Sequence, residues 1–406
     1  MYNYSNQKLP QRTSDMITML CLASFCLFSF CYLLCMKGDL LAEAQFAFSH
    51  GVTHYSHFFG ALMITIILML IQMLTLKMTG LSGKLYALTF LPSFLFLIVV
   101  TSVNKNVFGD FTFGSWVWVI PLVLVLYVIA VSVIKQLAFH FSTYDDDSHA
   151  SKHLWPNFLI MLVMMLICGS IQNVNDVDMY ELKVEEELLD ADYEDAARIG
   201  QEALATSPRL NQLRCFALAN LGKLGDDMLN YPQPYKGDGL IDLTDTFSYE
   251  RINSRDVCAA IGSYSGKSVK TVSRYLDLVL EADKDRTNTM IRDYYLCNKL
   301  LNNDLQGFLN VMHQYYALKD SFLVTDLPRL YKEALVIEAS AIGEDSLNNF
   351  CDSVALQTYR DYTALCKEYE SETQRYNYTR RRFSNTFYWY RDNYKRLSTT
   401  EERAGM

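Results

Sequence analysis

The stretch ALMITIILMLIQMLTL, residues 61–76, contains no charged side chain and is too apolar for an ordinary buried helix of a soluble domain. A helix that crosses the ~30 Å hydrocarbon core of a bilayer needs roughly 20 consecutive apolar residues. Five runs meet this requirement without any Asp, Glu, Lys or Arg, namely residues 16–36, 55–76, 85–103, 116–134 and 154–172. We therefore predict five transmembrane helices within residues 1–172.

The direction of these helices follows from the distribution of Lys and Arg, because basic residues resist translocation. The N-terminal segment and the second and fourth loops hold six basic residues, namely Lys8, Arg12, Lys77, Lys84, Lys135 and Lys152. The other two loops hold only Lys37 and Lys105. This bias places the N-terminus in the cytoplasm and residues 173–406 outside it, in the periplasm if the source is a diderm bacterium. We expect the first run to be a retained anchor, because no small-residue cleavage pattern follows it.

Charge divides the chain at the same boundary. Residues 173–406 carry 38 acidic and 28 basic side chains, a net charge of −10, whereas residues 1–172 carry 7 and 8, a net charge of +1. An acidic domain is a poor general binder of nucleic acid, whose phosphates attract clustered Lys and Arg. We therefore expect the lipid bilayer as a partner of residues 1–172, and no nucleic acid as a partner of the rest.

The stretch DADYEDAARIGQEALATSP, residues 190–208, resembles the second half of a tetratricopeptide repeat, in which small residues let two helices approach closely. The proline of this pattern ends the second helix. The expected repeat-packing residues are Ala191, Tyr193, Ala196, Gly200, Ala203 and Pro208. Helical hairpins also recur downstream, with turns near residues 222–224 and 302–304. We predict an all-α chain, a five-helix transmembrane bundle followed by a tetratricopeptide-like, degenerate α-solenoid over residues 173–406; an irregular all-α domain is the alternative.

Three further stretches carry a family resemblance. They are LRCFALANLGKLGDDMLNYPQ (213–233), LPRLYKEAL (327–335) and FSNTFYWY (383–390). In this order after the apolar runs, they resemble an uncharacterised family of Bacteroidota inner-membrane proteins. In that family a multi-span region precedes a periplasmic tetratricopeptide-like tail. The resemblance implies a multi-pass inner-membrane location, and it supplies no catalytic residues to carry over.

Polar side chains gather near the start of the second apolar run. If SHGVTHYSHFFG (49–60) is helical, then His50, His54 and His57 share one face and could ligate a metal, with Asp39 or Glu43 completing the site. The alternative is that these histidines are interfacial polar residues, because Gly51 weakens the helix. We expect no metal and no cofactor. Asp39 and Glu43 are also the catalytic candidates of an alternative, enzymatic interpretation.

Two features of the second part remain open. RYNYTRRRFSNTFYWYRDNYKR (375–396) is its only strongly basic stretch; it is either a binding surface or a closing helix that packs Phe387, Trp389 and Tyr390 inward. Five cysteines occur there without a close CxxC pair, and we expect most to be buried thiols that pack between helices. They are Cys215, Cys258, Cys297, Cys351 and Cys366.

The function expected from these observations is that of a membrane-anchored scaffold or adaptor rather than an enzyme. The apolar runs contain no Asp, Glu, Lys or Arg, which disfavours an ion-coupled transporter. A tetratricopeptide-like domain outside the cytoplasm would bind a protein or peptide partner. The alternative is a polytopic glycosyltransferase-like enzyme, with Asp39 and Glu43 in the first outer loop.

Overall fold

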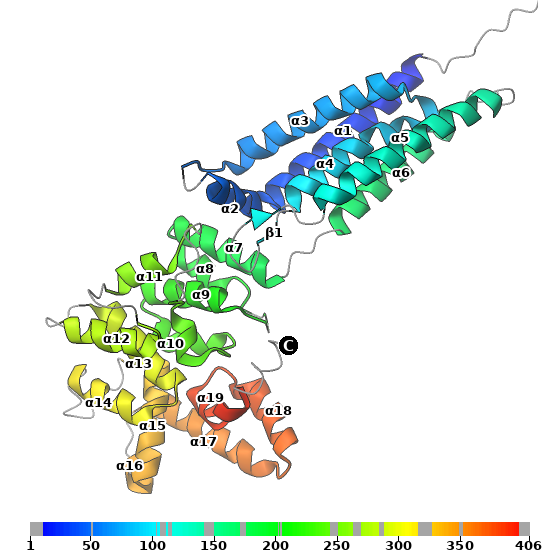
Figure 1. Ribbon diagram of the computed structural model, residues 1–406. Coiled ribbons are helices and arrows are strands. Elements are labelled where there is room, and N and C mark those ends of the chain that lie inside the picture. The colour runs from blue at the N-terminus through cyan, green and yellow to red at the C-terminus, as the bar shows by residue number, and fades with distance from the viewer. Residues whose placement is uncertain are drawn as a thin grey trace, which may run out of the picture. The chain divides into compact units, whose positions relative to one another are not determined.

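The computed structural model describes residues 11–49, 52–102, 104–105, 111–112, 116–141, 150–170, 176–201, 203, 205–243, 251–262, 269–283, 288–315, 327–348 and 352–397. These residues are predominantly helical, which confirms the all-α class. The chain forms two compact units, residues 1–175 with 249–251 and residues 176–248 with 252–406 (Figure 1). Each unit is described by itself.

The first unit is a bundle in which α1, α3, α4, α5 and α6 run alongside one another (Figure 1). Its helices are α1 (Gln11–Cys35), α2 (Gly38–Phe48), α3 (His57–Thr79), the 3₁₀ helix η1 (Gly83–Phe90), α4 (Leu91–Thr101), α5 (Trp116–Phe141) and α6 (Ala150–Ser170). Two short strands, β1 (Asn104–Lys105) and β2 (Phe111–Thr112), pair antiparallel with Asn104 opposite Thr112.

Among the described residues, two helices are long and apolar enough to cross a bilayer, over Asp15–Cys35 and His57–Thr79. Three apolar helical stretches are shorter, namely Leu85–Thr101, Trp118–Val133 and Leu154–Ser170. The predicted run 85–103 differs most from a simple span, because it is divided between η1 and the 11-residue α4. Proline stands in the first turn of α4. It has no N–H to donate, and the first turn of a helix is the position that tolerates this, so Pro92 suits the start of α4.

The first unit turns polar side chains inward. Gln72 of α3 is 2% exposed, and its Nε2 donates to Tyr86 Oη and Thr89 Oγ1, both at 3.2 Å. Asn157 of α6 is fully buried; its Oδ1 accepts from the Ala87 N–H and its Nδ2 donates to the Gly83 carbonyl, both at 2.7 Å. Asn157 thus satisfies backbone groups of η1 that a continuous α-helix would satisfy within itself.

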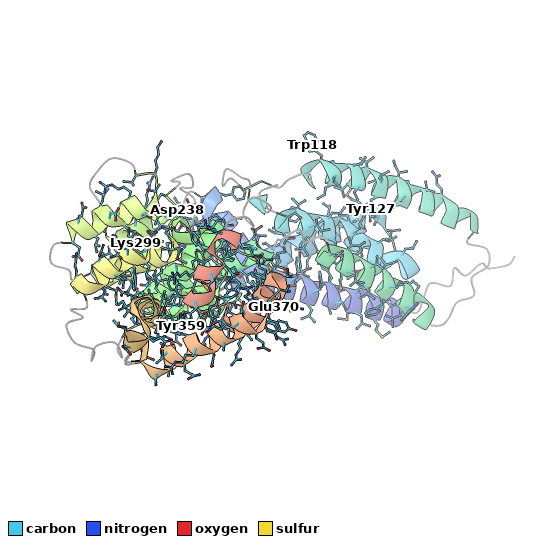
Figure 2. All side chains as sticks on the ribbon, turned by 90° about the horizontal axis from the view of Figure 1, so that it is seen from below. Trp118, Tyr127, Asp238, Lys299, Tyr359 and Glu370 are labelled. Carbon is cyan, nitrogen blue, oxygen red and sulfur yellow. The ribbon has the colours of Figure 1, made fainter. Side chains whose placement is uncertain are left out.

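The outer faces of the same helices are apolar. Trp118 on α5 is 83% exposed and projects from the helix, whereas Tyr127 on the same helix is 9% exposed and donates to the Leu88 carbonyl at 3.1 Å (Figure 2). Large apolar residues are likewise exposed along α3 and α6, among them Leu70 at 60% and Leu166 at 62%. This polarity, with hydrogen-bonding groups inside and apolar groups outside, is the reverse of a soluble domain.

The second unit is a stack of shorter helices around one continuous hydrophobic core. Its helices are α7 (Asp176–Leu189), α8 (Tyr193–Arg198), α9 (Pro208–Asn220), α10 (Leu224–Asp227), η2 (Met228–Asn230), η3 (Lys236–Leu240), α11 (Ser254–Ile261), α12 (Val272–Ala282), α13 (Thr289–Leu301), α14 (Leu305–Tyr315), α15 (Arg329–Ile342), α16 (Glu344–Asn348), α17 (Ser353–Glu368), α18 (Glu372–Phe383) and α19 (Phe387–Asp392). They pack mostly against sequence neighbours.

The expected repeat hairpin is formed only in part. α7 and α8 pack together, and Ala196 is fully buried on α8. However, α8 ends at Arg198 rather than continuing to Pro208, because Arg214 Nη2 donates to the carbonyls of Ile199 at 3.0 Å and Gly200 at 2.9 Å. Those carbonyls would have paired along a longer helix. The sequence pattern could not show a hydrogen bond from a side chain fourteen residues away.

Glycine is required at position 200, where the chain turns after the end of α8. Its φ is +63°, in the region that favours glycine, and a Cβ there would lie 2.4 Å from Arg214 Nη2. Ala203 therefore lies in a turn rather than on a helix, and Pro208 opens α9 instead of ending the preceding helix. Ser207 caps α9 by accepting from the Leu210 N–H at 2.9 Å, and Pro208 fits the first turn because it needs no partner for an N–H.

Candidate functional site

A cavity of about 1080 Å³ opens in the second unit between three segments that are distant in sequence. The first wall is formed by Gln201, Ala203, Ala205 and Thr206, the second by the segment 229–235, and the third by α18, α19 and Leu397. Its size is that of a pocket for a drug-sized ligand or slightly larger. Most of the side chains that line it are tyrosine, tryptophan, asparagine, glutamine and arginine.

The second wall is made by YPQPY, residues 231–235. The two prolines fix φ and cannot continue a helix, so the chain runs as an extended wall between η2 and η3. Gln233 secures this wall because its Nε2 donates to the Met228 carbonyl at 2.8 Å. Tyr235 joins the first two walls by donating from its hydroxyl to the Thr206 carbonyl at 3.2 Å.

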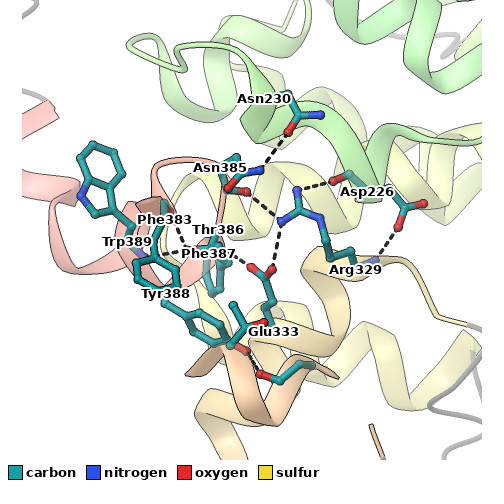
Figure 3. Close-up of polar contacts among 12 residues, drawn as sticks. Asp226, Asn230, Arg329, Glu333, Phe383, Asn385, Thr386, Phe387, Tyr388 and Trp389 are labelled. Atoms are coloured by element: carbon teal, nitrogen blue, oxygen red, sulfur yellow. Dashed lines mark hydrogen bonds and ion pairs between the residues drawn. The ribbon is translucent and has the colours of Figure 1, made fainter. Parts of the chain in front are cut away.

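The third wall depends on α19, which has only six residues and is held in place by α15 (Figure 3). Glu333 of α15 is 3% exposed, and its Oε2 accepts from the backbone N–H of Phe387 at 2.6 Å. Its Oε1 accepts from Arg329 Nη1 at 3.0 Å. Arg329 also donates to the Asn385 carbonyl at 3.0 Å and to the Asp226 carbonyl at 2.7 Å. The Arg329–Glu333 pair therefore ties α10 and the start of α19 to α15.

Burial raises the pKa of Glu333 from its ordinary 4.5 to about 7, although Arg329 and the Phe387 N–H both favour the ionised form. The free-energy cost of removing the carboxylate from water exceeds the stabilisation that its two partners provide. The carboxyl group that positions α19 therefore titrates near neutral pH. On the opposite side of α19, the indole of Trp389 points away from Glu333 (Figure 3).

Two buried polar atoms of cavity residues have no hydrogen-bond partner among the described residues. They are Nε1 of Trp389, a donor, and Oε1 of Gln233, an acceptor. Each of these two side chains is 5% exposed. Buried polar groups in folded proteins are nearly always paired, and the exceptions concentrate where a ligand or water binds. Two lining residues of the cavity therefore carry buried polar atoms that no described group satisfies.

The charged groups that line the cavity are all positive. Arg380 and Arg381 on α18 line it, both are exposed, and neither forms an ion pair with a described residue. No Asp, Glu, His, Lys or Cys occurs among the described residues of the lining. The adjacent Arg382 does not line the cavity and lies 3.9 Å from Asp361. In a domain of net charge −10, this absence of carboxylates gives the cavity a local positive character.

A third cation lies behind the lining. Arg214 is 1% exposed, and its guanidinium carbon is 4.7 Å from the ring centroid of Tyr231, a lining residue. Its Nε and Nη1 have no partner among the described residues, and burial lowers its pKa. A buried guanidinium without a carboxylate partner is costly, and its field adds to that of Arg380 and Arg381.

The structure separates the predicted metal candidates. His50 lies outside the described residues. Residues 53–56 are not helical and α3 begins at His57, so His54 and His57 are not aligned on one helical face. His54 is exposed with its ring against Phe46, whereas His57 Nε2 lies 3.7 Å from Asp39. Within the described residues no three His, Cys, Asp or Glu side chains are grouped to hold a metal ion.

The alternative catalytic pair lies one turn apart on α2. Asp39 is half-exposed beside His57, and Glu43 is 4% exposed.

The basic stretch near the end buries its aromatic residues and leaves two of its arginines exposed. Phe387, Trp389 and Tyr390 are buried, at 0%, 5% and 3% exposure, as a closing helix requires. Arg380 and Arg381 stay exposed and line the cavity. Among the repeat-packing residues, Ala203 also lines it, whereas Ala191 is exposed in the α7–α8 turn with φ of 59° and Tyr193 is half-buried. Sequence patterns suggested the arginines and aromatics but not the opposing YPQPY wall.

The described cysteines are free thiols. Cys215 and Cys297 are buried between helices, Cys258 and Cys366 are half-buried, and Cys351 lies outside the described residues. Cys297 Sγ lies 3.6 Å from Tyr331 Oη.

Comparison with known proteins identifies one similarity. The profile of a family described as "Family of unknown function (DUF6057)" matches residues 250–393. No curated protein and no solved structure matches the chain. The matched region contains the α18–α19 wall and the Arg329–Glu333 pair, whereas the two other walls of the cavity precede it.

Proposed function

We propose that this chain is a membrane-anchored binding protein. The first unit holds it in a lipid bilayer, and the second unit binds a segment of a protein or peptide partner in the cavity between the YPQPY segment and α18–α19. In this role the protein acts as a scaffold or adaptor that keeps its partner close to the membrane surface.

Membrane anchoring is supported by the polarity of the first unit. Two of its described helices have the length and apolarity of membrane spans. Gln72 and Asn157 are hydrogen-bonded inside the bundle, while Trp118 and Leu166 are exposed on its outside. Lipid tails favour such an arrangement, because they cannot satisfy polar groups and do not penalise apolar ones.

The location of the second unit outside the cytoplasm is supported by the basic residues of the loops. Six Lys and Arg residues flank the faces assigned to the cytoplasm, against two on the other side. With five crossings, the cavity would face the periplasm of a diderm bacterium. The five-span count extends to runs that in the structure are shorter helices, so it belongs to this proposal.

Binding rather than catalysis is favoured by one observation, the chemistry of the cavity lining. The described lining residues contain no carboxylate, histidine, lysine or cysteine that could serve as general acid, general base or strong nucleophile. They do contain aromatic faces, amides, two arginines and two unpartnered buried polar atoms, which are the groups that recognise a ligand. A binding role accounts for all of them.

Site-specific photocrosslinking in intact cells tests this proposal. A photoreactive phenylalanine analogue is placed at Asn377, which is exposed and lines the cavity, or at its neighbour Tyr378, which is 50% exposed and does not line it. We expect the Asn377 position to capture one defined protein and the Tyr378 position to capture much less of it. Equal capture at both positions, or capture of a polyprenyl-linked sugar from Asn377, would contradict the proposal, and the second result would favour the enzyme.

A further inference from the structure

The chemistry of the cavity also defines which kind of segment it accepts. We propose that the occupant is an acidic peptide segment, whose carboxylates are recognised by Arg380 and Arg381 and whose backbone meets Trp389 and Gln233. This inference rests on the proposed function and names the class of partner sequence that the same site selects.

Two arginines that line the cavity favour an acidic occupant. Arg380 and Arg381 line the cavity, are exposed, and have no ion-pair partner among the described residues. Their neighbour Arg382 does have one, in Asp361. A guanidinium presents a planar pair of N–H donors that matches a carboxylate, and the described lining residues include no carboxylate that could pair with Arg380 or Arg381. These two arginines therefore favour an anionic occupant.

The buried cation strengthens this preference. Arg214 lies against the Tyr231 ring that forms part of the lining, and among the described residues no ion pair neutralises it. Because it is 1% exposed, its field is screened by water much less than that of a surface arginine. The three arginines therefore attract acidic peptides to the cavity and repel basic ones.

The neutral groups favour a peptide over other anions. Trp389 Nε1 needs an acceptor and Gln233 Oε1 needs a donor, and a peptide unit supplies one C=O and one N–H. The exposed amide of Asn377 offers a further paired donor and acceptor along the third wall. A cavity of about 1080 Å³ exceeds the size of a single side chain and admits a short extended segment.

The test uses the full chain in lipid nanodiscs and titration calorimetry with four defined probes. N-acetyl-tetraglutamate amide carries only side-chain carboxylates, and N-acetyl-tetraalanine carries only a terminal one. N-acetyl-tetraglutamine amide is the neutral control, and tetragalacturonate is a saccharide with the same number of carboxylates as tetraglutamate. We expect at least one acidic peptide to bind about tenfold or more tightly than the neutral peptide and the saccharide. Which of the two acidic probes binds shows whether the cavity recognises side-chain or terminal carboxylates.

Matched arginine variants assign the binding to the cavity. Arg380→Gln/Arg381→Gln should weaken the acidic peptide by about tenfold or more, whereas Arg382→Gln, an equivalent loss of charge on the same helix, should leave its affinity unchanged. Preference for tetragalacturonate, equal binding of the neutral peptide, no binding of either acidic peptide, or equal effects of all the arginine variants would each overturn the inference. If Asn377 still captures a defined protein in cells, only the acidic-peptide inference fails and the proposed function stands.

Discussion

Replacing Glu333 by glutamine should remove a pH-dependent component of the stability of the second unit. The pKa of Glu333 rises from 4.5 to about 7 on folding, chiefly because the carboxyl group is buried. Between these pH values the folded chain keeps the proton that the unfolded chain releases. The stabilising contribution is therefore complete below pH 4.5 and is lost as pH rises through about 7.

The magnitude follows from the same interval. At about 1.4 kcal/mol for each tenfold change in proton affinity, a rise from 4.5 to about 7 corresponds to about 3 kcal/mol of unfolding free energy. Glu333 is 3% exposed, so solvent screening does not reduce this figure substantially. In the Glu333→Gln variant the side chain stays neutral, and this component should disappear.

Urea unfolding of the full chain in detergent at pH 5 and pH 8 measures the effect. Replacing Trp116, Trp118 and Trp155 by phenylalanine leaves Trp389, on the helix that Glu333 holds, as the only fluorescent tryptophan. The difference in unfolding free energy between the parent and Glu333→Gln should change by about 2.5 kcal/mol between the two pH values, because at pH 5 the unfolded carboxyl group is already partly ionised. Glu344→Gln, on the exposed face of α16, controls for the loss of one acidic residue. Identical pH dependence in the parent and Glu333→Gln would refute the reasoning.

Three other predictions concern the second unit and its placement. Ala196→Leu should cost about 1–3 kcal/mol of unfolding free energy, because Ala196 is fully buried. Ala203→Leu should cost little stability and should reduce ligand binding, because Ala203 lines the cavity. Equal losses of stability in the two variants would contradict this placement. Gly200→Ala should lower the melting temperature, since its φ is +63° and the new Cβ would collide with Arg214; an unchanged melting temperature would show that the turn is not formed. Protease added to the outer face of intact cells should digest the second unit and spare the loop 142–149, and protection of the second unit would reverse the proposed orientation.

The helical class and the apolar helices could be predicted because local patterns determine them. Long runs of apolar residues favour helices, and α3 covers the whole of the stretch 61–76. The division of the run 85–103 could not be predicted from Pro92, because Pro121 and Pro156 lie inside the continuous helices α5 and α6. What the pattern could not show is that Asn157, seventy residues away, satisfies the backbone of η1.

The extent of α8 was unpredictable for a related reason. α7 and α8 pack together and Ala196 is fully buried on α8, whereas the tetratricopeptide-like assignment stays a prediction. α8 ends early instead, because Arg214 donates hydrogen bonds to the carbonyl oxygens of Ile199 and Gly200. A long-range hydrogen bond to a buried arginine has no signature in the local sequence.

The cavity was the least predictable feature. Its third wall lies within the basic and aromatic stretch that the sequence indicated, but the opposing wall, YPQPY, is about 145 residues earlier in the chain. Only the tertiary contacts that Arg329 and Glu333 make with α10 and α19 bring these segments together. Unpartnered atoms such as Trp389 Nε1 are likewise visible only once every neighbour has been placed.

The central claim, that the cavity is a binding site, is tested most directly by the indole N–H resonance of Trp389. The full chain labelled with ¹⁵N-tryptophan should give four indole signals, one per tryptophan, and Trp389→Phe identifies the one in the cavity. Addition of the protein captured from Asn377 should shift the Trp389 signal and slow its exchange with water, while the signals of Trp116, Trp118 and Trp155 stay in place. A Trp389 signal that does not move while the captured protein is bound would contradict the account.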